Sequence, residues 1–306
     1  MKIAVLGCGA MGSIYAGLLL KAGNEVLAVD VWKEHVDAIN RNGLRVEGPL
    51  GDHKFAVKAS VQVPDEKVDM VVVAVKAAHL SSVVKDLHRL CKPSTVVLTI
   101  QNGVGSADIL AEYINPDRLC IGIAKAFGAI LKAPAYAFHN SMNEISIGAF
   151  AGLSKEEINE IVSVWKKAGF NAHAVEDVIA IQWEKLICNV AYSAPCALTN
   201  MTVGELMLDS NMGPISRAAA IEAWAVARAL GIGIKIDNPV KFVQDFAKGM
   251  PAAKPSMLQD HENHRASEID VINGAVPKAA LRAGLEAPVN MTLVGLVKAK
   301  EKAFSL

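Results

Sequence analysis

Short apolar runs alternate with stretches of helical period over the first 176 residues of the chain. Residues 3–6 and 70–75 are almost wholly apolar, which is typical of strands in the middle of a parallel sheet. Further strands are expected at residues 25–29, 95–100, 119–126, 136–140, 144–148 and 171–175, with short ones between 44 and 61. Helices are expected at residues 13–22, 33–40, 80–90 and 155–168. This alternation predicts an α/β fold with a doubly wound sheet, closed by pairing of 136–140 with 144–148.

From residue 177 the pattern changes to long helical periods with almost no strand signal. Helices are expected at residues 178–200, 212–230, 239–248, 260–283 and 289–303. Pro195 could interrupt the first of these, and Gly274 with Pro277 could kink the fourth. The chain is therefore predicted to form two domains, an α/β domain of residues 1–176 and an all-α domain of residues 177–306.

A glycine-rich turn follows the first expected strand and opens the first helix. Gly7, Gly9 and Gly12 fit G-x-G-x-x-G, in which the glycines allow a sharp turn, close approach of a pyrophosphate and tight helix packing. The start of the helix offers free N–H groups to phosphate oxygens. We therefore predict a Rossmann-type domain that binds a dinucleotide; a purely structural glycine turn is the alternative. The expected contacts are Gly7, Cys8, Gly9, Ala10, Met11 and Gly12.

Three polar residues follow expected strands, at the sheet edge where ligands of such folds bind. Asp30 stands where a carboxylate accepts hydrogen bonds from the adenosine ribose, which favours NAD(H) over NADP(H). Lys76 is a candidate cofactor contact and, with Lys33, could still pair with a phosphate. Asn102 could hold a nicotinamide ribose or a substrate hydroxyl. The alternatives are a solvated aspartate, a solvated lysine and a turn or capping asparagine.

The second half of the chain carries a candidate proton donor. Lys185 and Asn189 are four residues apart on an apolar helix, and Ser193 extends their face by one more turn. Desolvation lowers the pKa of a lysine in such surroundings, which suits a general acid near neutral pH. The alternative is a surface lysine whose stem covers apolar side chains.

Glu268 and Ser256 are further candidates in the helical half. Glu268 lies in a segment expected to be helical, where it could simply pair with Arg265. Ser256 stands at a helix entry, where its hydroxyl and nearby N–H groups could bind a carboxylate; helix capping is the alternative.

Composition and charge narrow the class of partner. The 31 basic and 31 acidic residues cancel, and no apolar run is long enough to cross a membrane, so neither nucleic acid nor a membrane is expected. Five scattered cysteines without C-x-x-C indicate buried thiols in a reducing cytoplasm, and the dispersed histidines give no support for a metal site. Cys8, inside the glycine turn, is best explained as a small residue that fits there. The expected partner is a small molecule, and apolar helix faces could support a homodimer.

Taken together, these motifs resemble the ketopantoate reductase family over essentially the whole chain. The resemblance rests on residues 7–12, Lys76, and residues 101–103, 185–189, 255–260 and 265–274. It implies a substrate site in the cleft between a Rossmann domain and a helical domain. It also implies that Lys185 is the general acid, that Glu268 holds the substrate hydroxyl and orients the lysine, and that further residues position the substrate. These are Asn102, Asn189, Ser193 and, at the substrate carboxylate, Ser256.

Two departures from the family pattern leave the cofactor and the substrate open. The family usually has a basic residue just after the second strand to read NADPH, where this chain has Asp30, Val31 and Trp32. Ser193 stands where a second asparagine is common, so one side-chain amide is missing from the pocket.

Four functions follow from the residues and the resemblance. The leading hypothesis is NAD(P)H-dependent reduction of a 2-keto acid to a D-2-hydroxy acid, with ketopantoate as the first choice. An NAD-dependent D-2-hydroxyacid dehydrogenase for branched or aromatic, mandelate-like substrates is the second. A β-hydroxyacid dehydrogenase also has a lysine helix of this kind, but Ser256 and Glu268 argue against it. An NAD(P)-sensing regulator is the non-enzyme alternative, and it would need no proton donor.

Overall fold

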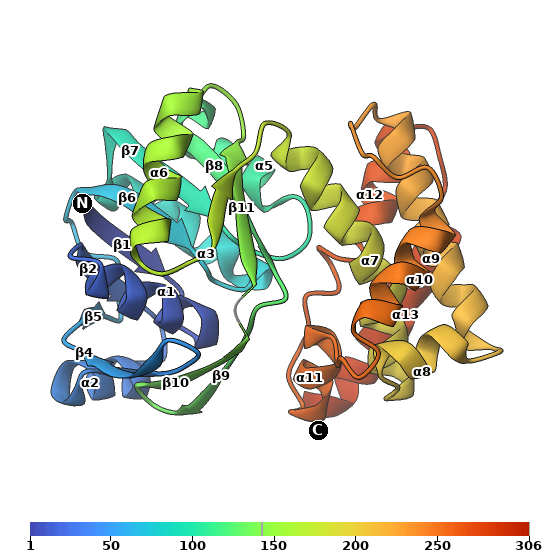
Figure 1. Ribbon diagram of the computed structural model, residues 1–306, viewed down its shortest axis with the longest axis horizontal. Helices are drawn as coiled ribbons and strands as arrows, with labels where there is room; N and C mark the ends of the chain where they lie inside the picture. The colour runs from blue at the N-terminus through green and yellow to red at the C-terminus, as the bar shows by residue number, and fades with distance from the viewer. Residues whose placement is uncertain (142, 306) are drawn as a thin grey trace. The chain divides into compact units, whose positions relative to one another are not determined.

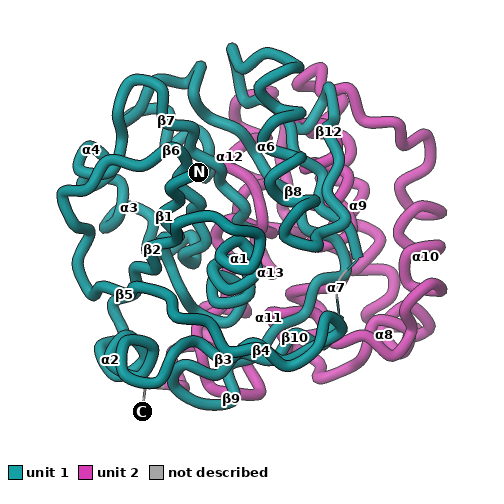
Figure 2. The backbone as a smooth tube through the Cα atoms, turned by 60° about the vertical axis from the view of Figure 1, so that its left-hand side comes forward, with its two compact units in different colours: residues 1–101, 106–178 teal, residues 102–105, 179–306 magenta. Residues whose placement is uncertain are grey.

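The computed structural model describes residues 1–141 and 143–305 and divides the chain into two compact units. The first unit contains residues 1–101 and 106–178, and the second contains residues 102–105 and 179–306 (Figure 2). The first is built on β-sheets with helices, and the second is helical, so the predicted fold class is confirmed. The units divide two residues after the boundary expected from the sequence. The assignment of residues 102–105 to the helical unit is not anticipated by the sequence.

An eight-stranded sheet forms the centre of the first unit (Figure 1). Its strands are, in spatial order, β12 (Ala172–Ala174), β11 (Glu144–Ala149), β8 (Leu119–Lys125), β7 (Cys91–Thr99), β6 (Val68–Val73), β1 (Lys2–Leu6), β2 (Glu25–Val29) and β5 (Lys58–Ser60). The strands from β8 to β5 pair in parallel, while β11 runs antiparallel to β8. The apolar runs of β1 and β6 are buried, as is typical of parallel strands whose side chains are covered on both faces of the sheet.

A second sheet of four strands replaces the closing pair expected from the sequence. Its order is β4 (Gly51–Phe55), β3 (Leu44–Gly48), β10 (Tyr136–Ser141) and β9 (Gly128–Ala133). The expected pairing of β10 with β11 is wrong: β10 pairs with β3 and β9, whereas β11 pairs with β8 and β12. A tight turn at Ala135, with φ 58°, folds β10 back on β9, which the sequence pattern does not reveal.

The helices of the first unit differ from the prediction in two places: residues 80–90 do not form one helix, and α5 (Ser106–Ala111) is not predicted from the sequence. They are α1 (Ala10–Lys21), α2 (Lys33–Asn42), α3 (Leu80–Val83), α4 (Leu87–Leu90), α5 (Ser106–Ala111) and α6 (Lys155–Lys167), with 3₁₀ turns η1 (Ala77–His79), η2 (Val84–Asp86) and η3 (Pro116–Arg118). The single helix expected at residues 80–90 is wrong, because η2 separates α3 from α4. The serine and valine pairs at residues 81–84 are weak helix formers, which is consistent with this break.

The second unit consists of helices around the long α7. They are α7 (Val178–Thr199), α8 (Val203–Leu208), α9 (Met212–Ala229), α10 (Pro239–Gly249), α11 (Ser256–Glu262), α12 (Ala275–Arg282), α13 (Pro288–Glu301) and η4 (Lys302–Ser305). Pro195 lies inside α7 without ending it.

The single helix expected at residues 260–283 is wrong, because its two ends belong to separate helices, α11 and α12. His264, with φ 51°, adopts a left-handed conformation just after α11. The N–H groups of His264 and Arg265 donate to the carbonyls of His261 and Asp260, at 3.0 and 2.9 Å. These two bonds form a Schellman motif, which ends a helix. Residues 263–274 therefore form loops and turns, and Glu268 lies there rather than on a helix.

Candidate active site

The three glycines of the turn after β1 meet three different spatial demands. Gly7 has φ +86°, and a Cβ there would lie 2.5 Å from Val75 N. A Cβ at Gly12 would overlap the carbonyl oxygen of Gly7. A Cβ at Gly9, by contrast, would meet nothing within 4 Å. The turn therefore requires Gly7 and Gly12 for its own packing and leaves open space over Gly9, as a bound pyrophosphate requires.

The start of α1 offers backbone donors beside this open space. Gly9 is the N-cap residue and α1 begins at Ala10, so the first N–H groups of the helix have no partner within it. Ala10 and Met11 are partly exposed, whereas Cys8 has no exposed surface. Burial raises the pKa of the Cys8 thiol to about 12. The glycine turn thus fits a dinucleotide phosphate through its backbone, with the Cys8 side chain directed into the core.

Asp30 and Lys76 lie at the carboxyl ends of the two strands that flank β1. Asp30 follows β2, and its Oδ1 accepts a hydrogen bond of 2.9 Å from the backbone N–H of Trp32. This bond fixes the carboxylate at the strand end. Lys76 follows β6 after two residues, and its side chain is exposed. Both residues therefore share the sheet edge with the glycine turn, as the sequence predicts.

In the second unit, the segment of residues 102–105 is attached to the turn that contains Val271. Gly103 has φ +80°, and a Cβ there would overlap the carbonyl oxygen of Val271. The N–H of Val104 donates to that same oxygen at 3.0 Å. Gln182 of α7 donates from Nε2 to the carbonyl of Gly103 at 2.9 Å. The close approach of two backbones is therefore possible because residue 103 is glycine.

This attachment brings Asn102 between Lys185 and Glu268. Lys185 Nζ donates to Asn102 Oδ1 at 2.9 Å, and Asn102 Nδ2 donates to Glu268 Oε2 at 3.2 Å. An ammonium group only donates and a carboxylate only accepts, so the amide orientation is set by its two neighbours. All three side chains are partly buried. The structure therefore joins three candidates that are 83 and 166 residues apart in the chain.

The loop that carries Glu268 is held in place by buried and surface contacts. Asn273 has no exposed surface, and its Nδ2 donates to the carbonyl of Val190 in α7 at 3.1 Å. Arg265 Nε lies 3.4 Å from Asp260 Oδ1, so the arginine forms its ion pair there rather than with Glu268. Glu268 is thus connected to the candidate general acid through Asn102.

The other three candidates are positioned by the helices that carry them. Asn189 is partly buried one helical turn after Lys185, and Ser193 is only 4% exposed a further turn along α7. Ser256 is the first residue of α11, and its side chain is exposed. Pro255 is the N-cap of that helix and there is no side-chain capping bond, so capping does not explain Ser256.

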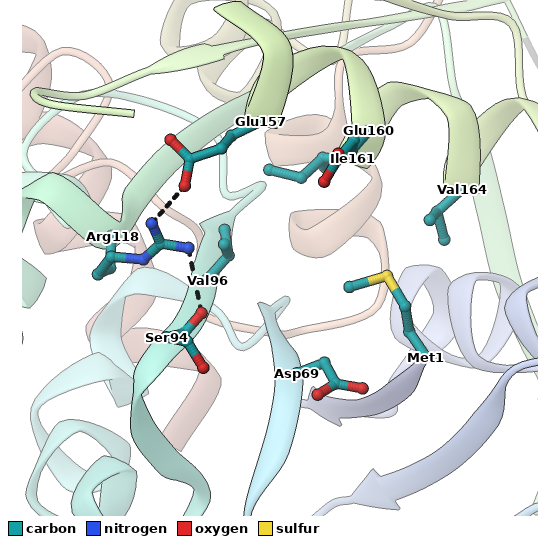
Figure 3. A pocket seen from close by; sticks show the side chains of 9 residues that line it. All are labelled: Met1, Asp69, Ser94, Val96, Arg118, Glu157, Glu160, Ile161 and Val164. Atoms are coloured by element: carbon teal, nitrogen blue, oxygen red, sulfur yellow. Dashed lines mark hydrogen bonds and ion pairs between the residues drawn. The ribbon is translucent and has the colours of Figure 1, made fainter. Parts of the chain in front are cut away.

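A pocket of about 270 Å³ in the first unit lies toward the amino-terminal ends of the parallel strands, whereas the glycine turn lies at their carboxyl ends (Figure 3). It is lined by Met1, Asp69, Ser94, Val96, Arg118, Glu157, Glu160, Ile161 and Val164. These residues belong to the amino-terminal parts of β6 and β7 and to neighbouring segments. The pocket is thus separate from the glycine turn. Within the described residues, no group of three or more His, Cys, Asp or Glu side chains could hold a metal ion.

Sequence reasoning missed two residues that hold the candidate site together. Gln182 anchors the carbonyl of Gly103, and Asn273 ties the loop of Glu268 to α7. Gln182 lies three residues before Lys185 and so on the same helix face, which is a usable signal. Asn273 gives no comparable signal, because its partners, the carbonyl of Val190 and the side chain of Asn290, are distant in the sequence.

Comparison with known proteins identifies the family. Residues 3–152 match the ketopantoate reductase PanE/ApbA family, and residues 177–301 match the C-terminal domain of the same family. The chain belongs to the ketopantoate reductase family. It is therefore an NAD(P)-dependent oxidoreductase that acts on a CH–OH group.

Individual relatives of this family cover nearly the whole chain. The 2-dehydropantoate 2-reductase of Pyrococcus abyssi is 33% identical over 303 residues, which is 98% of each protein. The structure of a ketopantoate reductase from Ralstonia eutropha JMP134 has a TM-score of 0.90 at 29% identity and covers 100% of both chains. The structure of D-mandelate dehydrogenase with NADH and anilino(oxo)acetate has a TM-score of 0.92 at 27% identity, again over 100% of both chains. No helix among the described residues is long and apolar enough to cross a membrane.

Proposed function

We propose that the protein reduces a 2-keto acid to a D-2-hydroxy acid with NAD(P)H, and that ketopantoate is the first substrate to test. The observation that carries this proposal is the hydrogen-bonded arrangement of Lys185, Asn102 and Glu268 in the helical unit. It holds a proton donor in a fixed position, and a proton is what reduction of a ketone needs besides the hydride. The family relation to 2-dehydropantoate 2-reductases supports the choice of substrate.

In the proposed reaction, each group of this site has one role. The reduced nicotinamide supplies the hydride when the cofactor is bound. Lys185 donates a proton from Nζ to the ketone oxygen as negative charge develops there. Glu268 accepts from the substrate hydroxyl, and Asn102 keeps the lysine and the carboxylate in fixed positions. Asn189 and Ser193 position the substrate along α7, and Ser256 binds its carboxylate.

A second candidate is an NAD-dependent D-2-hydroxyacid dehydrogenase for branched or aromatic substrates. The similarity to D-mandelate dehydrogenase bound to NADH supports it. So does Ser193, which is smaller than the asparagine common at this position of the family and is nearly fully buried. A smaller side chain there leaves more room for a bulky substrate.

Initial rates with a panel of 2-keto acids distinguish the two candidates. Ketopantoate, 2-ketoisovalerate, 2-ketoisocaproate and phenylglyoxylate are each tested with NADH and with NADPH. We expect measurable reduction of at least one of them. The kcat/KM for ketopantoate should exceed that for each of the others by about tenfold or more, which is the discrimination that a binding pocket can achieve. Faster turnover of phenylglyoxylate with NADH would favour the second candidate. Absence of turnover with all four would contradict both.

Replacement of Asp30 tests the cofactor preference. We expect Asp30→Ala to weaken NADH binding about tenfold, because the ribose hydroxyls lose a charged acceptor worth roughly 1.5 kcal/mol, while NADPH binding is unchanged or tighter. Dissociation constants from nicotinamide fluorescence give the comparison. Asp37→Ala is the matched control, because Asp37 is a nearby carboxylate of α2 that pairs with Lys33 instead. Equal losses for both dinucleotides would contradict a ribose contact.

The cellular setting belongs to the proposal as well. The five cysteines are free thiols, and four of them are buried, which suits a protein of a reducing cytoplasm.

Exposed apolar side chains of the helical unit, such as Leu281 and Met291, could support a homodimer. Sedimentation velocity at micromolar concentration tests this, and a monomer would contradict it.

A further inference from the structure

A buried histidine connects three segments of the first unit beside the glycine turn. His35 belongs to α2, and its side chain has no exposed surface. Its Nδ1 accepts from the N–H of Ala135 at 3.0 Å, and its Nε2 lies 3.4 Å from Ser13 Oγ. Ser13, in the first turns of α1, donates from Oγ to the carbonyl of Cys8 at 2.8 Å. A continuous chain of hydrogen bonds thus runs from the β9–β10 turn to the peptide between Cys8 and Gly9.

The groups at the two ends of this chain of hydrogen bonds determine which atom donates in each bond. The N–H of Ala135 can only donate, so Nδ1 of His35 is unprotonated and the neutral ring carries its hydrogen on Nε2. The Ser13 hydroxyl proton is directed to the carbonyl of Cys8, so its oxygen is the acceptor for Nε2–H. Both ends therefore require the same tautomer of His35. Trp32 covers the ring, with stacked centroids 5.3 Å apart.

We propose that His35, as a neutral Nε2–H imidazole, is a positioning residue for cofactor binding, which it supports by fixing Ser13 and hence the Cys8 peptide of the glycine turn. This inference rests on the proposed binding of a dinucleotide phosphate at that turn. The peptide held by Ser13 leads directly into Gly9 and the first N–H groups of α1. Loosening it would misalign the donors that face the pyrophosphate.

The hydrogen-bond chain from Ala135 through His35 and Ser13 to Cys8, here called the relay, depends on pH through the charge state of His35. Burial lowers the pKa of His35 from its ordinary value of 6.5, whereas the carboxylate of Asp30, at the end of β2, and the nearby backbone carbonyl of Cys8 act in the opposite sense. The Cys8 thiol, which also adjoins Ser13, stays neutral because its pKa is about 12. Protonated His35 cannot accept from Ala135, so the relay is complete at neutral pH and is lost only as the pH falls through the lowered pKa of His35. We therefore expect dinucleotide binding to weaken in that range.

Binding of NAD⁺ and NADH to Ser13→Ala and His35→Leu variants of the full chain tests the inference. At pH 7.5 we expect the dissociation constants to rise about tenfold in either variant. The double variant should bind no more weakly than the single variants, because both residues act in the same hydrogen-bond chain. At saturating NADH, kcat and the KM for the 2-keto acid should stay within about twofold, since the relay does not touch the proton donor. His88→Leu is the matched control, because His88 is an exposed histidine of α4. Ser13→Ala removes a single oxygen atom and keeps the test valid if His35→Leu does not fold.

Two further measurements separate a positioning role from a structural one. In ¹⁵N-histidine spectra of the wild-type protein, His35 should show an unprotonated Nδ1 and a protonated Nε2 at neutral pH. The dissociation constant of NAD⁺ should rise in the wild type as the pH falls through the lowered pKa of His35, and it should change less in Ser13→Ala. The opposite tautomer, or tighter binding at low pH, would overturn the inference. Wild-type binding retained by both variants would overturn this inference alone, whereas a wild-type protein that binds neither NADH nor NADPH would overturn the proposed function too.

Discussion

Replacement of Lys185 by methionine should abolish reduction while the cofactor still binds. Methionine keeps the length and apolar contacts of the side chain but cannot donate a proton to the ketone oxygen. Because a positioned general acid typically contributes about 10²–10⁴-fold, we expect kcat to fall by that factor. The dissociation constant of NADH should stay within about twofold, since the glycine turn and Asp30 belong to the other unit of the chain. Steady-state rates and fluorescence titration of the same preparation measure both quantities.

The control for this prediction is a lysine of the same unit outside the site. Lys248 is 65% exposed in its side chain and pairs with Asp245 on α10, so Lys248→Met should keep wild-type kcat. A Lys185→Met enzyme with full turnover would exclude this residue as the proton donor. A parallel loss of cofactor binding would instead indicate that Lys185 supports the fold of the site.

The parts of the molecule that sequence reasoning predicts well are those whose physical cause is local. The glycine turn is set by residues within one strand–turn–helix unit, and its three glycines have the spatial surroundings that the spacing implies. The apolar runs of β1 and β6 predict buried parallel strands because no other element of that length buries every side chain. Lys185 and Asn189 share a helix face for an equally local reason: residues four apart in an α-helix lie on the same side.

The errors and omissions concern features that depend on distant partners or on backbone conformation without a glycine. The helix expected at residues 260–283 ends early because His264 adopts a left-handed conformation that its residue type does not announce. The pairing of β10 with β3 joins segments about ninety residues apart, so adjacency in sequence misleads. Asn102 is a candidate from its place after a strand, yet its contacts are with Lys185 and Glu268 of the helical unit. The role expected for Glu268 comes from the family resemblance alone, whereas the apolar helix around Lys185 already makes that residue a candidate general acid.

Replacement of Gly103 by alanine should disable the enzyme through the loop that carries Asn102. The added Cβ would overlap the carbonyl oxygen of Val271 and lie 2.7 Å from its carbonyl carbon, so one backbone segment must move. Asn102 would move with it, away from its bonds to Lys185 and Glu268. A displacement of roughly 1 Å in a catalytic arrangement can cost about 100-fold in rate, and we expect a loss of kcat of that order. Rates and urea unfolding of the variant measure the two consequences.

Gly105 in the same loop provides the control, because it separates steric overlap from backbone strain. It also has positive φ, +107°, but a Cβ there would meet nothing within 4 Å. Gly105→Ala should therefore lose only the roughly 1–2 kcal/mol that an unfavourable backbone conformation costs, and it should retain most of its kcat. Gly103→Ala should lose more stability and far more activity. If both variants lose the same stability and keep the same kcat, contact with Val271 is not what holds Asn102 beside Lys185, and the proton donor must be positioned by α7 alone.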